Sequence, residues 1–183
     1  SRLLLKAGAL GLPRVAAEVC ARFAAEGIGP ERLRLCGWED KVEQHLAAYG
    51  EVDVALDSFP YNGTTTTCEA LWMGVPVVTV AGVRHAARVG ASLLHSVGLD
   101  ELVARSEDEY VERAVRLAAD LPRLARLREG MRERLRRSPL MDESGFGQDL
   151  ERGYLELWQA KSAPPTQTSV MRIIPSRSCS SRR

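Results

Sequence analysis

Residues 53–82, DVALDSFPYNGTTTTCEALWMGVPVVTVAG, carry the pattern that decides the fold of this chain. An apolar run ends at Asp57, an Asn-Gly turn and four threonines follow, and a helix-like segment then leads to the β-branched run 75–80. This order predicts two parallel strands joined by a helical crossover. Pro76 stands near the start of the second strand, where a missing backbone donor is tolerated.

The same alternation of strand-like and helix-like segments continues on both sides of this unit. Val15, Val19 and Phe23 recur at four-residue spacing, as on one face of a helix that ends at Gly27. Further strands are predicted at 2–6, 33–36, 52–56 and 99–104, and further helices at about 42–50, 69–73, 85–97, 106–120 and 122–137. We therefore predict an α/β fold over residues 1–160, with a doubly wound, mainly parallel, Rossmann-like sheet covered by helices on both faces.

Composition and charge limit the classes of partner. The chain has 183 residues, of which 45% are hydrophobic, and 25 basic against 24 acidic side chains give a net charge of +1. This balance points to neither nucleic acid nor a membrane surface as a partner. No apolar run approaches the roughly 18 residues of a membrane span, and no signal peptide is recognisable, so we predict a cytoplasmic protein. The four cysteines are far apart without a CxxC pair, which favours free thiols over a metal site or disulfides.

The carboxyl-terminal part of the sequence has three sections. Residues 122–137 are rich in Arg and Leu and are interpreted as a solvated basic helix, with an anion site as the alternative. Leu150, Tyr154, Leu157 and Trp158 predict a final amphipathic helix that packs onto the body of the protein. Residues 161–183 are rich in Ser, Pro and Arg without a period, and this composition predicts a disordered tail. The abrupt apolar start suggests a fragment.

The threonines place several hydroxyl groups at the start of a helix. In an open α/β sheet, ligands bind outside the carboxyl ends of strands, and residues 57–67 lie at such an end. A helix N-terminus offers unpaired N–H groups and a partial positive charge, and Gly63 allows a phosphate to approach the backbone. A diphosphate suits this loop, and Glu69 could accept hydrogen bonds from a ribose. The alternative is that one threonine caps the helix and the others are surface residues.

The order of residues adds a resemblance to this local chemistry. Residues 53–82 closely resemble the carboxyl-terminal, nucleotide-sugar-binding half of the protein O-linked N-acetylglucosamine transferases, glycosyltransferase family 41. The resemblance continues through HAARVGASLLHSVGLDELVA, 85–104, and SPLMDESGFGQDLERGYLELW, 138–158. It implies the second of the two facing Rossmann-like domains of a GT-B glycosyltransferase, with the amino-terminal half and, in many members, tetratricopeptide repeats upstream.

At matching positions the resemblance also implies roles for individual residues. The implied UDP-sugar site comprises Asn62, Gly63, Thr64, Thr65, Thr66 and Glu69, together with His45. Thr65 and Thr66 match the threonines that hold the diphosphate, and Glu69 stands where better-known members have an aspartate on the ribose. Thr64 replaces a histidine of the animal members, a difference shared with bacterial-type relatives.

The base-binding part departs further from the family pattern. His45 resembles the histidine that stacks on uracil, and backbone groups near Glu39 and Asp40 would then read the edge of the base. Val42 replaces the family's uracil-side lysine, and Ala48 replaces an arginine one turn after the histidine. Recognition of the diphosphate is therefore better preserved than recognition of the base.

The resemblance implies transfer of N-acetylglucosamine from UDP to serine or threonine hydroxyls of proteins, with inversion and without a metal or other cofactor. The catalytic base and the acceptor groove would lie upstream, so no catalytic residue is predicted here and this chain alone should be inactive. His85 and His95 are interpreted as structural, and no Ser-His-Asp order or separated carboxylate pair suggests a hydrolase. The alternatives are transfer from another UDP-sugar and a non-catalytic Rossmann-like interaction module.

Overall fold

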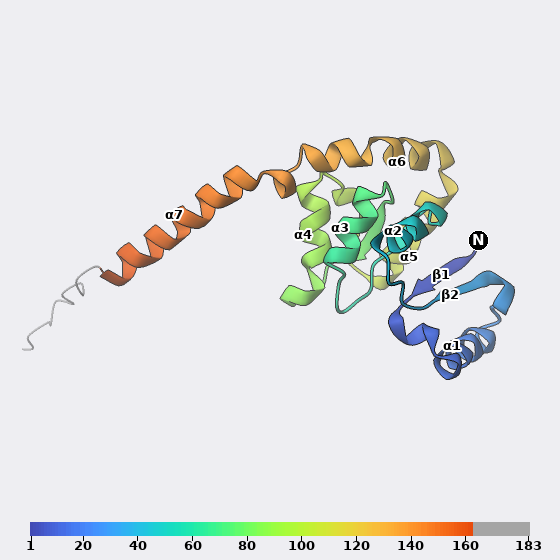
Figure 1. Ribbon diagram of the computed structural model, residues 1–183. Coiled ribbons are helices and arrows are strands. Elements are labelled where there is room, and N and C mark those ends of the chain that lie inside the picture. Colours follow the sequence, from blue (N-terminus) through green and yellow to red (C-terminus); the bar gives the residue numbers. More distant parts are fainter. Residues whose placement is uncertain (163–183) are drawn as a thin grey trace, which may run out of the picture. The chain divides into compact units, whose positions relative to one another are not determined.

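A computed structural model describes residues 1–162 and shows strands alternating with helices (Figure 1). Residues 1–143 form one compact unit, and a second unit begins at Ser144. The strands are β1 (Leu3–Lys6), β2 (Leu33–Cys36), β3 (Ala55–Leu56), β4 (Val77–Val80) and β5 (Val103–Ala104). The α-helices are α1 (Pro13–Ala25), α2 (Val42–Ala47), α3 (Thr65–Trp72), α4 (Val89–Ser96), α5 (Glu107–Ala119), α6 (Leu121–Arg136) and α7 (Glu143–Ser162). Short 3-10 helices are η1 (Gly8–Gly11), η2 (Pro30–Arg32), η3 (Ala48–Glu51), η4 (His85–Ala87), η5 (Asp100–Leu102) and η6 (Pro139–Met141).

Every strand pairing in the described residues is parallel, as the alternating pattern predicts. β1 pairs with β2, with Leu3 opposite Leu33, and β4 lies between β3 and β5. The structure thus contains two parallel sheets where a single sheet was expected. Within the predicted strand 52–56 only Ala55 and Leu56 pair, and they pair with β4 alone.

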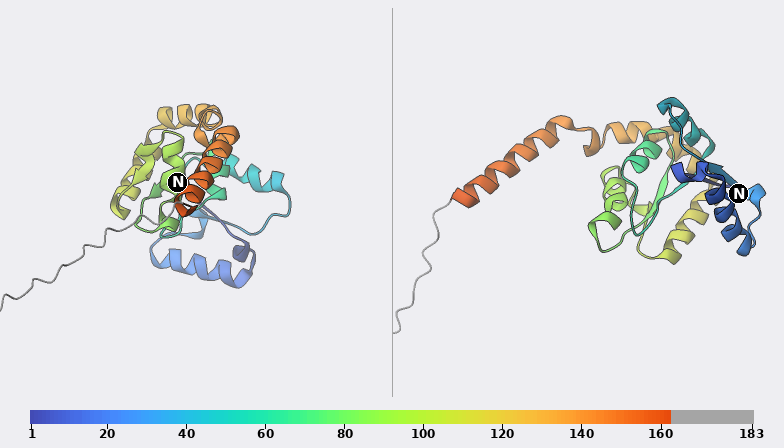
Figure 2. Two further views of the ribbon diagram at one scale, coloured as in Figure 1. Left: turned by 90° about the vertical axis from the view of Figure 1, so that its left-hand side faces the viewer. Right: turned by 60° about the horizontal axis from the view of Figure 1, so that its bottom comes forward.

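β4 is the centre of the main core. Val77, Val78 and Thr79 are consecutive and all buried, so both faces of the strand are covered. The helices α3, α4 and α5 contact β4, and α6 lies against α3 and α5 (Figure 2). The buried apolar side chains that fill this core include Leu71, Val75, Leu94, Leu99, Leu102, Leu117, Met131 and Leu135. By contrast, no residue of β1, β2 or α1 is buried.

Several predicted helix boundaries shift in the structure. The helix expected from Glu69 begins at Thr65, and the helix expected over 85–97 is divided into η4 and α4. α5 confirms the helix predicted over 106–120, and the Ser106 hydroxyl caps it by accepting the N–H of Glu109 at 3.2 Å. α6 confirms the helix predicted over 122–137.

The final helix and the free cysteines agree with the sequence in part. α7 confirms the predicted final helix and runs through Ser162, and its packing onto the rest of the protein stays a prediction. The prediction of a disordered tail falls almost entirely on residues 163–183, which lie outside the described part. Cys20, Cys36 and Cys68 are free thiols. Among the described helices, none is both long enough and apolar enough to cross a bilayer.

Candidate functional site

The loop between β3 and α3 brings the threonines to the surface. Thr64 is the N-cap residue of α3, but its side chain makes no capping hydrogen bond. Residues 64–66, which we call the threonine cradle, are exposed. Thr67 differs, because it is 3% exposed and its hydroxyl donates to the Gly63 carbonyl at 3.0 Å. One of the four hydroxyls therefore serves the fold, and the other three belong to exposed residues.

The backbone at the start of α3 offers the donors that an anion needs. The first residues of an α-helix have N–H groups without an intrahelical acceptor, and here these residues begin with Thr65. The N–H of Gly63 is already used, since it donates to Asp57 Oδ1 at 2.7 Å. Gly63 contributes space instead: a Cβ there would lie 2.3 Å from Thr66 Oγ1. The available backbone donors therefore belong to the cradle and not to Gly63.

Asn62 lies behind this loop. It is 1% exposed, its side-chain amide donates to the Ser58 carbonyl at 2.9 Å, and its Oδ1 accepts the N–H of Gly90 at 3.2 Å. Its own N–H donates to the Ala86 carbonyl at 2.8 Å. These three hydrogen bonds show that Asn62 supports the loop. A direct contact between Asn62 and a ligand stays a prediction.

α2 and α3 bring His45 and Glu69 together. His45 Nε2 lies 2.9 Å from Glu69 Oε2, although the residues are 24 positions apart in the sequence. About a quarter to a third of each side chain remains exposed, 30% for His45 and 26% for Glu69. Lys6 of β1 donates to the backbone carbonyl of His45 at 3.4 Å. The two residues predicted for base and ribose thus form one cluster beside the cradle.

Tyr49 belongs to the same cluster and was not predicted. Its hydroxyl oxygen lies 3.1 Å from Glu69 Oε2 and 3.3 Å from the Thr66 carbonyl oxygen, and these two acceptors share its single proton. Its ring meets the His45 ring edge-on at 6.0 Å. Burial, followed by the nearby Glu69 carboxylate, raises the pKa of Tyr49, so the phenol remains a donor. Its position one helical turn after His45 is the sequence signal that could have identified it.

The segment predicted to read the base edge lies between β2 and α2. Glu39 and Asp40 are exposed there, and Val42, which replaces the family lysine, is 67% exposed. The structure therefore leaves this side of the site open, and contact with a base stays a prediction. In the described residues, no group of three or more His, Cys, Asp or Glu side chains is arranged to hold a metal ion.

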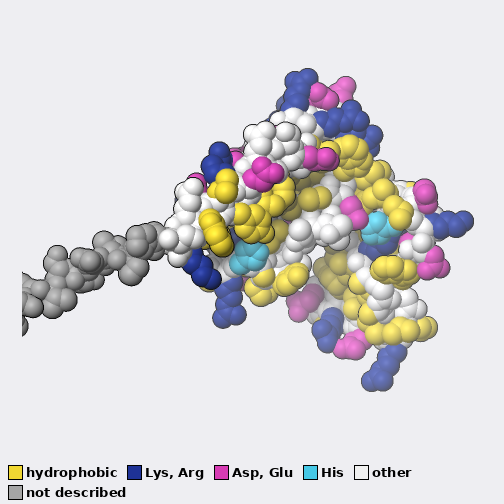
Figure 3. All heavy atoms as spheres, turned by 60° about the vertical axis from the view of Figure 1, so that its left-hand side comes forward, with side chains coloured by type: hydrophobic (Ala, Val, Ile, Leu, Met, Phe, Trp, Pro, Cys, Tyr) yellow, Lys and Arg dark blue, Asp and Glu magenta, His cyan; other side chains and the backbone are white. Residues whose placement is uncertain are grey.

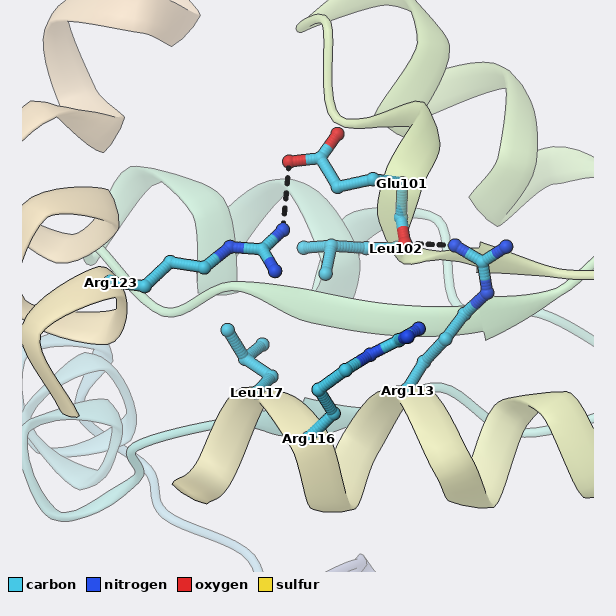
Figure 4. Close-up of a pocket in the computed structure, with 6 residues that line it drawn as sticks. All are labelled: Glu101, Leu102, Arg113, Arg116, Leu117 and Arg123. Carbon is cyan, nitrogen blue, oxygen red and sulfur yellow. Dashed lines mark hydrogen bonds and ion pairs between the residues drawn. The ribbon is translucent and has the colours of Figure 1, made fainter. Parts of the chain in front are cut away.

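A separate pocket of about 290 Å³ lies between η5, α5 and α6 (Figure 4). Its lining residues are Glu101, Leu102, Arg113, Arg116, Leu117 and Arg123. Arg113 donates to the Glu101 carbonyl and to Glu109, Arg123 lies 3.4 Å from the Glu101 carboxylate, and Arg116 lies 3.5 Å from Glu112. Each guanidinium has at least one partner within the described part of the chain, although the buried Nε of Arg113 has none there, and we assign this pocket to helix packing. On the face of the molecule drawn in Figure 3, acidic and basic side chains lie among one another.

The comparisons with known proteins agree with one another. The sequence model described as Glycosyl transferase family 41 matches residues 3–150. A probable UDP-N-acetylglucosamine–peptide N-acetylglucosaminyltransferase SPINDLY of Petunia hybrida is 46% identical over 159 residues, which cover 87% of this chain and 17% of that protein. The probable transferase SEC of Arabidopsis thaliana is 36% identical, over 74% of this chain and 14% of that protein.

A solved structure extends the likeness to three dimensions. A mutant of the Thermobaculum terrenum O-GlcNAc transferase has a TM-score of 0.81 and 43% sequence identity, over 87% of this chain and 30% of that one. The chain therefore spans less than a fifth of the curated relatives just described and about a third of this solved structure.

Proposed function

Because the chain belongs to glycosyltransferase family 41, we propose that it is the donor-binding portion of an inverting protein O-N-acetylglucosaminyltransferase. The donor is UDP-N-acetylglucosamine, and the acceptors are serine and threonine hydroxyls of proteins. The names of these relatives describe the same donor and a peptide acceptor. The GT-B-like α/β fold agrees with that of the solved O-GlcNAc transferase.

The observation that carries this proposal is the meeting of His45, Glu69 and the threonine cradle at the N-terminal end of α3. The imidazole of His45 offers a flat surface for uracil, and Glu69, held by His45 and Tyr49, offers carboxylate oxygens to the ribose hydroxyls. The cradle then receives the diphosphate on exposed hydroxyls and unpaired amides. This order along the site matches the order of groups in a UDP-sugar.

The chemistry proposed for this portion is stabilisation of the leaving group. An acceptor oxygen attacks the anomeric carbon, the bond from that carbon to the diphosphate breaks, and the bonding electrons leave with UDP. Negative charge then grows on the diphosphate oxygens, where the donors of the cradle and the positive end of α3 are most effective. The acceptor proton passes to a base outside this chain. No step requires a metal or another cofactor.

The remaining parts of the reaction are assigned to other regions of the complete protein. We propose that an upstream half supplies the base and the acceptor groove, that tetratricopeptide repeats precede it, and that the protein acts in the cytoplasm. The match to less than a fifth of each curated relative supports a larger protein. Neither nucleic acid nor a membrane is expected as a partner.

Calorimetric titration of the complete protein tests the donor site. UDP should bind to the wild type, and binding should weaken strongly in the double variant Thr65→Ala/Thr66→Ala. Titration with GDP provides the control for base recognition, because the open side near Val42 departs from the family pattern. Failure of the wild type to bind any nucleoside diphosphate would overturn the proposal and favour the non-catalytic interaction module.

A second measurement separates sugars. Transfer to a protein acceptor should be faster from UDP-N-acetylglucosamine than from other UDP-sugars at equal concentration. A preference for a different sugar would retain the donor-site assignment and replace the substrate, because groups that touch the sugar are divided between both halves of a GT-B enzyme.

A further inference from the structure

We propose that Asp57 is a positioning residue of the donor site, whose buried carboxylate fixes the peptide before the threonine cradle and so sets where the cradle meets the diphosphate. The inference rests on the proposed function, because it concerns the same ligand. Asp57 closes β3 and comes six residues before Gly63, so the two ends of the loop meet through its side chain.

Both carboxylate oxygens of Asp57 have defined partners. Oδ1 accepts the N–H of Gly63 at 2.7 Å, and Oδ2 accepts the hydroxyl of Thr79 at 2.7 Å. Asp57 is 7% exposed and Thr79 is fully buried, so water does not compete freely for these bonds. Hydrogen bonds to an ionised, buried acceptor are among the stronger ones in proteins.

The backbone of Asp57 is anchored as well. Its N–H donates to the Val78 carbonyl at 3.0 Å, and its carbonyl accepts the Tyr110 hydroxyl at 3.0 Å. Burial, with a smaller contribution from Asp57, raises the pKa of Tyr110 to about 12, so this donor persists at neutral pH. Asp57 is thereby joined to β4 and α5, which belong to the most buried part of the unit.

Gly90 packs closely against the carboxylate of Asp57. A Cβ at this position would lie 2.4 Å from Asp57 Oδ2 and 2.5 Å from Thr79 Oγ1, so only glycine leaves room for the pair. The N–H of Gly90 also bonds to Asn62 Oδ1 within the same loop. Gly90, near the start of α4, therefore lies directly against the Asp57 carboxylate that accepts the N–H of Gly63.

Gly63 connects Asp57 to the threonine cradle, because it precedes Thr64 directly. Its N–H is held by Asp57, and its carbonyl accepts the Thr67 hydroxyl at 3.0 Å. With both polar groups held, the residue that precedes Thr64 has little freedom to rotate. A carboxylate placed behind an anion site opposes the anion electrostatically, so its presence there is better explained by orientation of the donors than by attraction of the ligand.

Two kinds of variant test the role in the complete protein. Asp57→Ala removes both acceptors, whereas Asp57→Asn retains an oxygen for Gly63 and an amide that can donate to the Thr79 hydroxyl. We expect Asp57→Ala to raise the Kd for UDP about tenfold or more, the scale of one lost charge-assisted bond, and Asp57→Asn to recover most of that loss. Binding is measured by calorimetry beside a thermal melt of each preparation.

Two glycine variants give a second test that does not depend on whether Asp57→Ala folds. Gly90→Ala leaves the chemistry of Asp57 unchanged but displaces its carboxylate, so we expect the Kd for UDP to rise about tenfold, again the scale of one charge-assisted bond. Gly130→Ala is the matched control, because a Cβ on that α6 glycine meets nothing within 4 Å, and its Kd should equal that of the wild type.

The outcomes separate the two proposals. If the wild type binds no nucleotide, the proposed function fails and this inference fails with it. If the wild type binds UDP and folded Gly90→Ala binds it equally well, only the positioning role of Asp57 is overturned. The same conclusion follows if the Kd of Asp57→Asn is as poor as that of folded Asp57→Ala, because restored hydrogen bonding would then not restore the site.

Discussion

His45 is the residue on which the proposed recognition of the base depends most directly. Replacing it with alanine removes the flat ring proposed to stack on uracil, together with the bond from that ring to Glu69. We expect UDP binding to weaken by about 1 kcal/mol, at the lower end of the range for an aromatic side chain stacked on a base. Calorimetric titration of the complete protein with UDP measures the change.

His95 provides the matched control for this substitution. It lies on α4, its side chain is 79% exposed, and its partner is Asp100 at 2.7 Å. His95→Ala should leave the affinity for UDP unchanged. An unaltered affinity in a folded His45→Ala protein would instead return His45 to the class of ordinary surface residues.

Asp57 also links the stability of the unit to pH. Burial raises the pKa of its carboxyl above the ordinary value of 3.8, and the hydrogen bonds from Thr79, Gly63 and Ser58 offset this only in part. The folded state therefore binds the proton more tightly than the unfolded state, so this group's contribution to stability is lost as pH rises through the raised pKa. Asp57→Asn cannot titrate and should lack this loss.

Urea unfolding of the wild type and of Asp57→Asn at a series of pH values measures the effect. We expect the free energy of unfolding of the wild type, relative to the variant, to fall as pH increases from about the ordinary Asp pKa toward neutrality, because a raised native pKa has this sign. A difference that stays constant, or that changes in the opposite direction, would contradict the raised pKa.

At the scale of elements, we expect α3 to divide its threonines between ligand binding and the fold. Thr65→Ala/Thr66→Ala should lower kcat of the complete enzyme about ten- to a hundredfold or more per lost donor, by analogy with single oxyanion donors, and move Tm little. Thr67→Ala should do the reverse, because its buried hydroxyl bonds to the Gly63 carbonyl. The measurements are kcat for transfer to a protein acceptor and a thermal melt of the same preparations.

A large decrease in Tm with near-normal kcat in the Thr65→Ala/Thr66→Ala protein would mean that the exposed hydroxyls serve the fold. The structure offers no capping bond from Thr64 to suggest this. The comparison with Thr67→Ala is informative because both proteins lose hydroxyl groups within the first turn of α3.

The alternation of elements was predictable from the sequence because it depends on local patterns. The β-branched run before Ala81 predicted β4, and the helical pattern over 106–120 predicted α5. Strand pairing was harder to predict, since the length of β3 depends on which neighbours its residues find. Residues 52–56 read as one strand, yet only their last two positions pair.

The candidate site was predictable to a similar degree. His45, Glu69 and the threonine cradle were identified through the family resemblance, and the structure places His45 against Glu69. Tyr49 and the bond from Gly63 to Asp57 were missed, because the first joins residues 20 positions apart and the second gives a backbone N–H to a side chain instead of a ligand. The spacing of Tyr49 from His45 could have suggested Tyr49, but its bond to Glu69 and the bond from Gly63 to Asp57 require the fold.

At the scale of the whole molecule, this chain should bind without catalysing. Residues 1–162 contain the proposed donor site but not the proposed base or acceptor groove. We expect this chain to bind UDP and to transfer no sugar to a protein acceptor, and we expect transfer to require the upstream half. Radiolabelled transfer assays with the chain and with the complete protein distinguish these results. Measurable turnover by this chain alone would place a base within it.

The absence of buried residues from α2 affects how the family can diversify. α2 carries His45 and the exposed Val42, whereas α3 carries the cradle and contributes Leu71 to the core. Substitutions in α2 should therefore lower the free energy of unfolding little, whereas substitutions at the buried positions of α3 should lower it more. On the proposed assignment, substitutions in α2 change the contacts to the base and leave the diphosphate site on α3 intact, so we expect the preferred donor base to diverge faster among relatives than the bond-breaking chemistry.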